Sequence, residues 1–382
     1  MLSSFFSQSD IKLSDLEALC AQQTVLADYP HAAEVLKNIL IYNYSNCVAM
    51  LDGSEKEQTL KAEFARALNS GPGVIAIKGA VDPAVVDKST EMFFDIIQQE
   101  KAAGSGQGDH FGNNERVWNS LQKACEYDPD LFIDYYKNPL MALVCQAWLG
   151  PNYQMSAQIN NVKPGGKAQS AHRDYHLGFQ SPDTVAQYPA HAQMMSQYLT
   201  LQGGIVHVDM PLETGPTLFL PYSQQLKAGY MAYTRPEFRK YFDENHVQIP
   251  FEKGDMMFFS PALFHGAGNN VSSGDRLANL VQISSAFGRT METINRYKMM
   301  AAIYPALQNR LADGTITDRE LKDTIACVAE GYSFPTNLDS DPPVGGNAPE
   351  TAAQMVHKAL ANGWSWEQLE EELAAYAERQ KA

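Results

Sequence analysis

The middle of the chain, residues 153–289, constrains the fold more than any other part of the sequence. Runs of β-branched and aromatic residues alternate there with turn signals such as Pro164-Gly165 and Gly215-Pro216. Many short strands separated by tight turns are typical of a β-barrel or a jelly roll. We predict strands over residues 154–162, 198–210, 217–220, 247–249, 256–259 and 277–286.

The two flanks of this segment have a helical pattern instead. Residues 10–70 are predicted to be mostly helical, including residues 32–40, because apolar residues recur there at helical spacing. A short strand is predicted over residues 74–78. After residue 290 the chain is predicted to return to helix, and its last helix carries apolar residues that fit docking onto the core.

The pattern therefore predicts three parts. Residues 1–72 form an N-terminal helical segment, residues 73–290 a mainly β core with some helix, and residues 291–382 a C-terminal helical segment. The helical ends are candidates for a homo-oligomer interface.

The net charge and the cysteines limit the partners and the compartment. The 382 residues carry a formal charge of −15, whereas nucleic-acid and anionic-membrane surfaces need clustered Lys and Arg. The five cysteines are widely spaced and form no C-x-x-C pair, so neither a disulfide framework nor a zinc site is expected. No signal peptide or membrane span is expected, and we predict a cytoplasmic protein that binds no nucleic acid and no membrane.

A His-x-Asp pair, His172 and Asp174, lies in the β-rich segment. Side chains two apart on a strand point to the same face, so this pair can bring an imidazole and a carboxylate to one point. A third ligand from another strand would complete a 2-His-1-carboxylate face, which leaves positions on Fe(II) open. The best candidate is His265, which begins the Gly-rich stretch Gly266-Ala-Gly268.

The chain contains a second His-x-Asp pair, His207 and Asp209. Apolar residues flank it, as they would in a core strand, and the alternative interpretation is a structural histidine followed by an aspartate that ends the strand. A motif this short also occurs by chance. Spacing alone therefore leaves both pairs open.

Arg276 follows His265 by eleven residues. The residues between them are rich in Gly, Asn and Ser and can loop back, which would place Arg276 at the start of an antiparallel neighbouring strand. A guanidinium there can hold the far carboxylate of a dicarboxylate in a bidentate fork. The alternative is a surface arginine that pairs with Asp275.

The combination of His-x-Asp, a distant His and an Arg eleven residues later resembles the phytanoyl-CoA dioxygenase family. The resemblance covers roughly residues 73–290 and includes further segments: Gly73–Pro83, Leu149–Tyr153, Asp209–Ser223 and Gly254–Arg276. The chain departs from the family pattern at Glu213-Thr214, Tyr222 and Gln224, which are not metal ligands.

The resemblance implies a double-stranded β-helix (jelly-roll or cupin-like) that uses Fe(II), 2-oxoglutarate and O2. It places Asp209 outside the ligand strand, so the implied metal ligands are His172, Asp174 and His265. Arg276 is the implied 2-oxoglutarate ligand. Related halogenases lack the carboxylate ligand, so the intact Asp174 favours hydroxylation or another oxidation over halogenation.

Other residues are weaker candidates for the same site. Asn161 precedes Lys163-Pro164 and resembles a 2-oxoglutarate contact in related hydroxylases, although it fits equally well as a cap of the turn. Gln282 and Ser284 share a strand face with Arg276 and are therefore candidates for the pocket lining. Candidates flanking the ligand strand are Gln169, Tyr175, His176 and Phe179.

The function predicted from the sequence is a non-haem Fe(II)/2-oxoglutarate-dependent dioxygenase. It would hydroxylate a small-molecule or acyl substrate and release succinate and CO2. The alternative is a cupin-like metal-binding protein without 2-oxoglutarate turnover, for which Arg276 would have no cofactor role.

Overall fold

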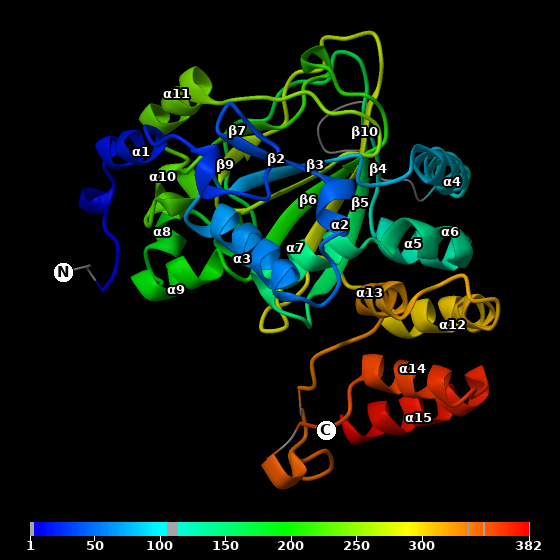
Figure 1. Ribbon diagram of the computed structural model, residues 1–382. Coiled ribbons are helices and arrows are strands. Elements are labelled where there is room, and N and C mark those ends of the chain that lie inside the picture. The colour runs from blue at the N-terminus through cyan, green and yellow to red at the C-terminus, as the bar shows by residue number, and fades with distance from the viewer. Residues whose placement is uncertain (1–3, 105–113, 335, 347, 382) are drawn as a thin grey trace.

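A mixed eight-stranded sheet forms the centre of the molecule (Figure 1). The computed structural model describes residues 4–104, 114–334, 336–346 and 348–381. The strand order is β1-β2-β3-β8-β6-β10-β5-β4, and neighbours run antiparallel except β2 and β3. The strands are β1 (Glu34–Leu36), β2 (Ile39–Asn43), β3 (Val74–Lys78), β4 (Glu115–Val117), β5 (Gln154–Val162), β6 (Thr200–Val206), β8 (Met256–Phe259) and β10 (Arg276–Ser284).

A second, two-stranded sheet packs against one face of the large sheet. It consists of β7 (Leu218–Leu220) and β9 (Phe264–Gly266). Phe219 of β7 meets Phe259 of β8 edge to face, with ring centroids 5.1 Å apart, inside an apolar cluster that joins the two sheets. Two sheets packed around a shared interior form a jelly-roll core, so the predicted double-stranded β-helix is confirmed.

Helices cover the other face of the large sheet and bury its apolar side chains. Those that belong to this layer are α3 (Glu55–Asn69), α4 (Pro83–Ala102), α5 (Ser120–Tyr127), α6 (Pro129–Tyr136), α7 (Pro139–Leu149), α12 (Arg296–Ala312) and α13 (Asp318–Val328). Local signals define their ends: Asp82 caps α4 through the amide of Ala84, and Asp128 caps α6 through the amide of Leu131. Among the described residues, no helix has the length and apolarity needed to cross a membrane.

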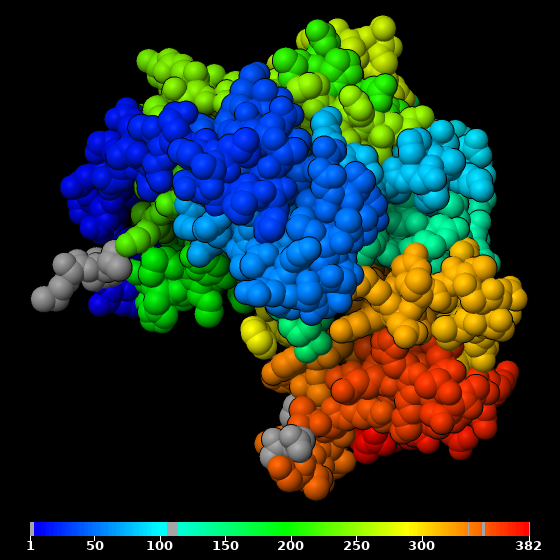
Figure 2. All heavy atoms as spheres, viewed as in Figure 1, coloured from blue at the N-terminus to red at the C-terminus, as the bar shows by residue number. Residues whose placement is uncertain are grey.

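The last two helices form an outer layer. These are α14 (Ala352–Ala361) and α15 (Trp366–Arg379), and they pack on α13 and α12. Figure 2 shows them as a lobe that protrudes below the rest of the molecule. Leu369 and Leu373 are buried and the Trp366 ring packs against Tyr304 of α12, so the predicted docking of the last helix is confirmed.

Smaller helices surround the end of the two-sheet core that holds β7 and β9. They are α1 (Leu13–Cys20), α8 (Pro182–Val185), α9 (Ala190–Ser196), α10 (Gly229–Ala232) and α11 (Pro236–Asn245), while α2 (Tyr44–Val48) follows β2. Side chains of α1 and of α8 to α11 share one apolar cluster. The described N-terminal residues therefore close this end of the molecule, as the blue segment of Figure 1 shows.

Two predictions about secondary structure are wrong. Residues 32–40 do not form a helix: β1 and β2 make a tight hairpin, with Lys37 and Asn38 at φ of 51° and 68° in its turn. The spacing misled because Val35 and Leu36 lie on one strand and Ile39 and Leu40 on the next, so their helical spacing arises across the turn of a hairpin. Residues 247–249 form only an isolated bridge, between Val247 and Phe219.

His207 lies just after β6, in the layer between the sheet and its covering helices. The side chain is 1% exposed. Its Nδ1 lies 2.8 Å from the Thr90 hydroxyl, which donates to the Val86 carbonyl, and its Nε2 lies 2.6 Å from the Tyr135 hydroxyl. The Thr90 oxygen must therefore accept from Nδ1–H, which leaves Nε2 to accept from Tyr135. His207 is a structural histidine with both nitrogens satisfied, as the alternative interpretation of this pair held.

The buried His207 is expected to make stability depend on pH. Burial lowers the pKa of His207 from 6.5 to about 3. Between these values the unfolded chain binds a proton that the folded chain does not. The free energy of unfolding should therefore fall as the pH drops below 6.5, by up to about 1.4 kcal/mol per pH unit from this group. Denaturant titrations at several pH values, on wild type and on His207→Gln, measure it. The free energy of unfolding should depend less on pH in His207→Gln than in wild type. An equal pH dependence in the two proteins would contradict a buried, neutral His207.

Candidate active site

Three side chains that the sequence singled out meet at one point. His265 lies in β9, and His172 pairs with it in an antiparallel bridge with N–O distances of 3.0 and 3.2 Å. Asp174 follows two residues later, held by a hydrogen bond from its amide to the Pro261 carbonyl. Asp174 Oδ2 lies 3.7 Å from His172 Nε2 and 3.4 Å from His265 Nε2. Within the described part of the chain, this is the one His, Cys, Asp and Glu group arranged to hold a metal ion.

Backbone contacts orient both imidazoles. His172 Nδ1 lies 2.9 Å from the Ser170 carbonyl, and His265 Nδ1 lies 2.8 Å from the Leu263 carbonyl. A carbonyl can only accept, so each Nδ1 carries the proton and each Nε2 presents its lone pair toward Asp174. This is the tautomer that a metal-binding histidine needs. The Phe259 ring packs edge to face on His265, 4.8 Å between centroids, which restricts rotation of that imidazole.

The protonation states suit metal binding as well. Burial, together with the neighbouring His265, lowers the pKa of His172 and keeps this imidazole neutral at neutral pH. Burial alone would raise the pKa of Asp174, but the pKa is lowered, and the hydrogen bond that Gln202 Nε2 donates to this carboxylate is one cause. Two neutral imidazole nitrogens and one carboxylate oxygen are the donor set of a facial triad that leaves metal positions open. The residues present therefore fit an iron ion.

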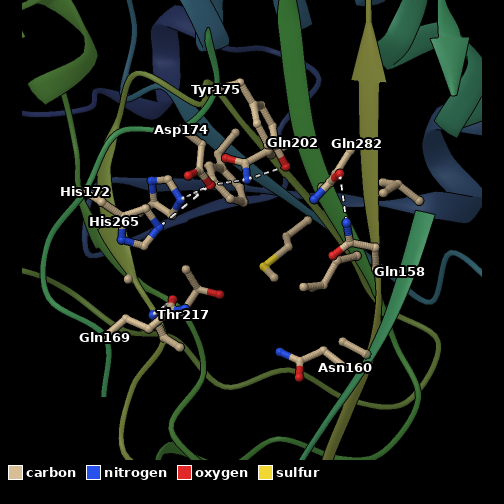
Figure 3. Close-up of a pocket in the computed structure, with 18 of the residues that line it drawn as sticks. Gln158, Asn160, Gln169, His172, Asp174, Tyr175, Gln202, Thr217, His265 and Gln282 are labelled. Atoms are coloured by element: carbon tan, nitrogen blue, oxygen red, sulfur yellow. Dashed lines mark hydrogen bonds and ion pairs between the residues drawn. The ribbon is translucent and has the colours of Figure 1, made fainter. Parts of the chain in front are cut away.

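Gln202 of β6 links Asp174 to the sheet. Its Nε2 donates to Asp174 Oδ2 at 2.7 Å and to the Tyr175 hydroxyl at 3.1 Å (Figure 3). Tyr175 has a positive φ of 56°, and this uncommon turn brings its buried side chain back beside Asp174. Sequence reasoning named Tyr175 only as a flanking candidate and missed Gln202, because no motif marks that glutamine. The one signal that the sequence offered for Gln202 was its position along the predicted strand, which decides the face of the sheet that its side chain lies on.

A cavity of about 820 Å³ opens from these three side chains. Its floor is the inner face of the large sheet, including Met257 and Phe259 of β8 and Ala278 and Leu280 of β10. Polar residues from β5, β6 and β10 form another part of its lining (Figure 3). The volume is at the upper end of the range that small-molecule sites occupy.

Arg276, the first residue of β10, lines the same cavity and is 8% exposed. Its Nη1 donates to the carbonyls of Thr214 and Gly268, at 3.3 and 3.1 Å. Those carbonyls converge because Gly215, at φ of 73°, packs directly on the chain at Gly268 and Asn269, where a Cβ would not fit.

The guanidinium of Arg276 is a buried positive charge. Burial lowers its pKa to about 10, so it stays charged at neutral pH. Within the described ranges no carboxylate forms an ion pair with Arg276, because Asp275 pairs with Lys163 instead, at 2.7 Å. The interpretation of Arg276 as a surface partner of Asp275 is therefore wrong. An anionic ligand in the cavity would find this charge available.

Asn161 is not brought to the cavity. It lies on β5 with its side chain on the opposite face from Asn160, and its Nδ2 donates to Glu115 at 2.9 Å and to Asp275 at 3.0 Å. Successive side chains of a strand point to opposite faces, and the register pairs Asn160, not Asn161, with the cavity-lining Ala278. The position of Asn161 thus does not support the cofactor contact expected from the sequence.

The weaker candidates divide between the cavity and other places. Gln169, Tyr175, Phe179 and Gln282 belong to the lining, whereas His176 and Ser284 do not. Ser284 has the right strand parity but lies at the far end of β10. Lining residues that the sequence did not suggest include Arg116, Gln158, Asn160, Gln202, Thr217 and Glu292.

The matched family agrees with the geometry. The profile described as phytanoyl-CoA dioxygenase (PhyH) matches residues 71–278, more than half of the chain. The chain belongs to the phytanoyl-CoA dioxygenase family. As a member of this family it is an oxidoreductase, a dioxygenase that depends on iron, 2-oxoglutarate and O2. No curated protein matches it in sequence.

Three solved structures are among those similar to this chain. The non-haem α-ketoglutarate-dependent epimerase SnoN from nogalamycin biosynthesis is 16% identical, with a TM-score of 0.42 over 60% of this chain and 84% of that one. The carbocyclase SnoK from the same biosynthesis is 18% identical, with a TM-score of 0.45 over 60% and 86%. HygX from Streptomyces hygroscopicus, with nickel and 2-oxoglutarate bound, is 12% identical, with a TM-score of 0.41 over 58% and 87%.

Substitutions in the two His-x-Asp pairs are expected to change the iron content of the protein differently. After anaerobic reconstitution with Fe(II), His172→Ala, Asp174→Ala and His265→Ala should each lose most of the bound iron, because a two-ligand site holds a divalent ion weakly. His207→Gln and the exposed His191→Ala should retain it. Elemental analysis of the desalted proteins measures iron per chain. Loss of iron in His207→Gln alone would show that the other pair binds the metal.

Proposed function

We propose that this dioxygenase binds one Fe(II) through His172, Asp174 and His265, binds 2-oxoglutarate against Arg276, and hydroxylates a small molecule in the adjoining cavity. The observation that carries the proposal is the joint placement of the three ligand side chains and Arg276 on one cavity. A metal-binding protein without 2-oxoglutarate turnover would have no use for a buried, charged arginine there.

The reaction balances as substrate R–H, O2 and 2-oxoglutarate giving R–OH, succinate and CO2. One oxygen atom enters the substrate and the other enters succinate, while the two electrons lost by the C–H carbon and the two released by decarboxylation reduce O2. Iron, when bound, supplies the redox chemistry that activates O2. Binding, orienting and shielding the reactants are the roles of the side chains that line the cavity.

Those side chains position and shield the reactants. Arg276 binds the far carboxylate of 2-oxoglutarate, and its own hydrogen bonds to two carbonyls keep the guanidinium from moving. Gln202 holds the Asp174 carboxylate in one orientation. The apolar residues Met257 and Phe259 exclude water from the floor beneath the reacting centre, which limits side reactions. The intact carboxylate at position 174 also favours hydroxylation or another oxidation over halogenation.

Arg276 should determine the affinity for 2-oxoglutarate. A charge-assisted pair contributes about 1.5–3 kcal/mol, and each 1.4 kcal/mol is a factor of ten. Arg276→Ala should therefore raise the KM for 2-oxoglutarate about tenfold or more, measured by succinate release with Fe(II) and O2. Arg276→Lys, which keeps the charge but not the fork, should lie between. The control Arg239→Ala changes an exposed arginine of α11 and should match wild type. An unchanged KM in Arg276→Ala would remove its cofactor role.

A further inference from the structure

Four carboxamide side chains line one side of the cavity. Gln158 and Asn160 come from β5, Gln202 from β6 and Gln282 from β10, and we call this group the amide wall (Figure 3). The sheet register explains the grouping, because Gln282 pairs with Gln202, and Ala278 pairs with Asn160 on the same face. Gln158 Nε2 also donates to Gln282 Oε1 at 3.3 Å. A side of this kind offers hydrogen bonds where a site for a hydrocarbon chain would offer methyl groups.

Several oxygens along this side of the cavity have no hydrogen-bond partner among the residues that the structure describes. They are Asn160 Oδ1, Gln202 Oε1 and, next to the wall, Glu292 Oε2, each buried. The nitrogen and the oxygen of the Gln202 amide can be told apart, because only Nε2 can donate to the Asp174 carboxylate. Oε1 is therefore the atom without a partner. All three atoms are acceptors, and leaving a buried acceptor unpaired costs about 1–3 kcal/mol. A ligand that supplied donors at these points would recover that free energy.

The charges at this end of the cavity offset one another. Glu292 lines the cavity together with Arg116. Arg116 Nη1 donates to Gln158 Oε1 at 2.8 Å, and its charge acts on the Glu292 carboxylate. Burial raises the pKa of Glu292, while the amide of Asn119 donates to its Oε1 at 2.8 Å. Because an arginine and a glutamate both line this part of the cavity, we expect it to favour a neutral ligand over an ammonium or an anion.

From the amide wall, the unpaired acceptors and this charge balance, we propose that the substrate is a neutral, polyhydroxylated small molecule. Its hydroxyl groups donate to Asn160, Gln202 and Glu292, and the C–H group to be oxidised faces His172, Asp174 and His265. Gln202 joins the two parts of the site, since its Nε2 holds Asp174 while its Oε1 accepts from the substrate. This inference rests on the proposed function, because it assigns the substrate class of the same site.

An acyl chain on a coenzyme carrier fits this cavity less well. Methylene groups against the wall would leave the three acceptors buried and unpaired. A phosphate-rich carrier needs several cations, and the cations among the described lining residues are three arginines. Arg173 donates to the carbonyls of Ser223 and Leu226, Arg116 lies between Gln158 and the Trp118 ring, and Arg276 is assigned to 2-oxoglutarate.

Binding and turnover can be measured separately on the loaded enzyme. Saturation-transfer NMR under anaerobic conditions, with Fe(II) and 2-oxoglutarate present, would screen three probe classes: neutral methyl glycosides and cyclitols, amino sugars, and acyl-CoA thioesters. The expected binders are in the first class. Admitting O2 to the best binder then tests for succinate above the rate without probe.

Two variants test the wall itself. Asn160→Leu replaces an unpaired acceptor by an apolar group of similar size and should weaken the best neutral binder about tenfold. For an acyl ligand the same change would leave binding equal or tighter, so the direction of the effect decides between the classes. Glu292→Gln keeps the contact with the Asn119 amide and should weaken the binder severalfold with little change in Tm. Asn245→Leu on the exposed end of α11 is the matched control.

The outcomes separate the two proposals. Best binding by an amino sugar or an acyl-CoA, no binding by any neutral probe, or unchanged affinity in both Asn160→Leu and Glu292→Gln would overturn the substrate class. Succinate release driven by an acyl-CoA would overturn the substrate class while the proposed function stood. Binding of neutral probes without any succinate on admission of O2 would overturn the proposed function while the binding preference stood.

Discussion

The backbone bridge between His172 and His265 is the interaction on which the rest of the site depends. Two hydrogen bonds, at 3.0 and 3.2 Å, join segments that are distant in sequence and set the two imidazoles side by side, with ring centroids 4.4 Å apart. The side chains add little freedom, because each Nδ1 is tied to a carbonyl two residues before it. Asp174 follows His172 by two residues, and the chain between them brings its carboxylate to the two imidazoles. The donor set is thus a product of backbone pairing rather than of side-chain flexibility.

The pleat of the large sheet sorts the remaining residues into two environments. On β5, Asn160 faces the cavity, while Asn161 turns away toward Glu115 and Asp275. On the strand pair β6 and β10, Gln202 and Gln282 face inward. His207, just beyond β6, turns into the helix layer, where Thr90 and Tyr135 satisfy it. Because successive side chains of a strand point to opposite faces, the residues of the cavity lie on one face of the sheet and the packing residues on the other.

The sequence was most informative where a short motif carried the chemistry. His172, Asp174, His265 and Arg276 could be proposed from spacing and family resemblance, and most strands of the core could be placed from their turns. The hairpin of β1 and β2 could not, because the apolar residues on either side of its turn fall by chance at helical spacing. Asn160 and Gln202 could not either, since strand register depends on pairing between residues far apart in the chain and no motif marks them. Asn161 was proposed from its resemblance to a cofactor contact, and without the register the sequence could not show that its side chain lies on the opposite face from the cavity.

The most direct test of the central claim is anomalous diffraction at the iron edge, from crystals grown anaerobically with Fe(II) and 2-oxoglutarate. We expect one strong iron peak within bonding distance of His172 Nε2, His265 Nε2 and an Asp174 carboxylate oxygen, and density for 2-oxoglutarate that ends at Arg276. An iron peak beside His207, or 2-oxoglutarate bound away from Arg276, would contradict the account.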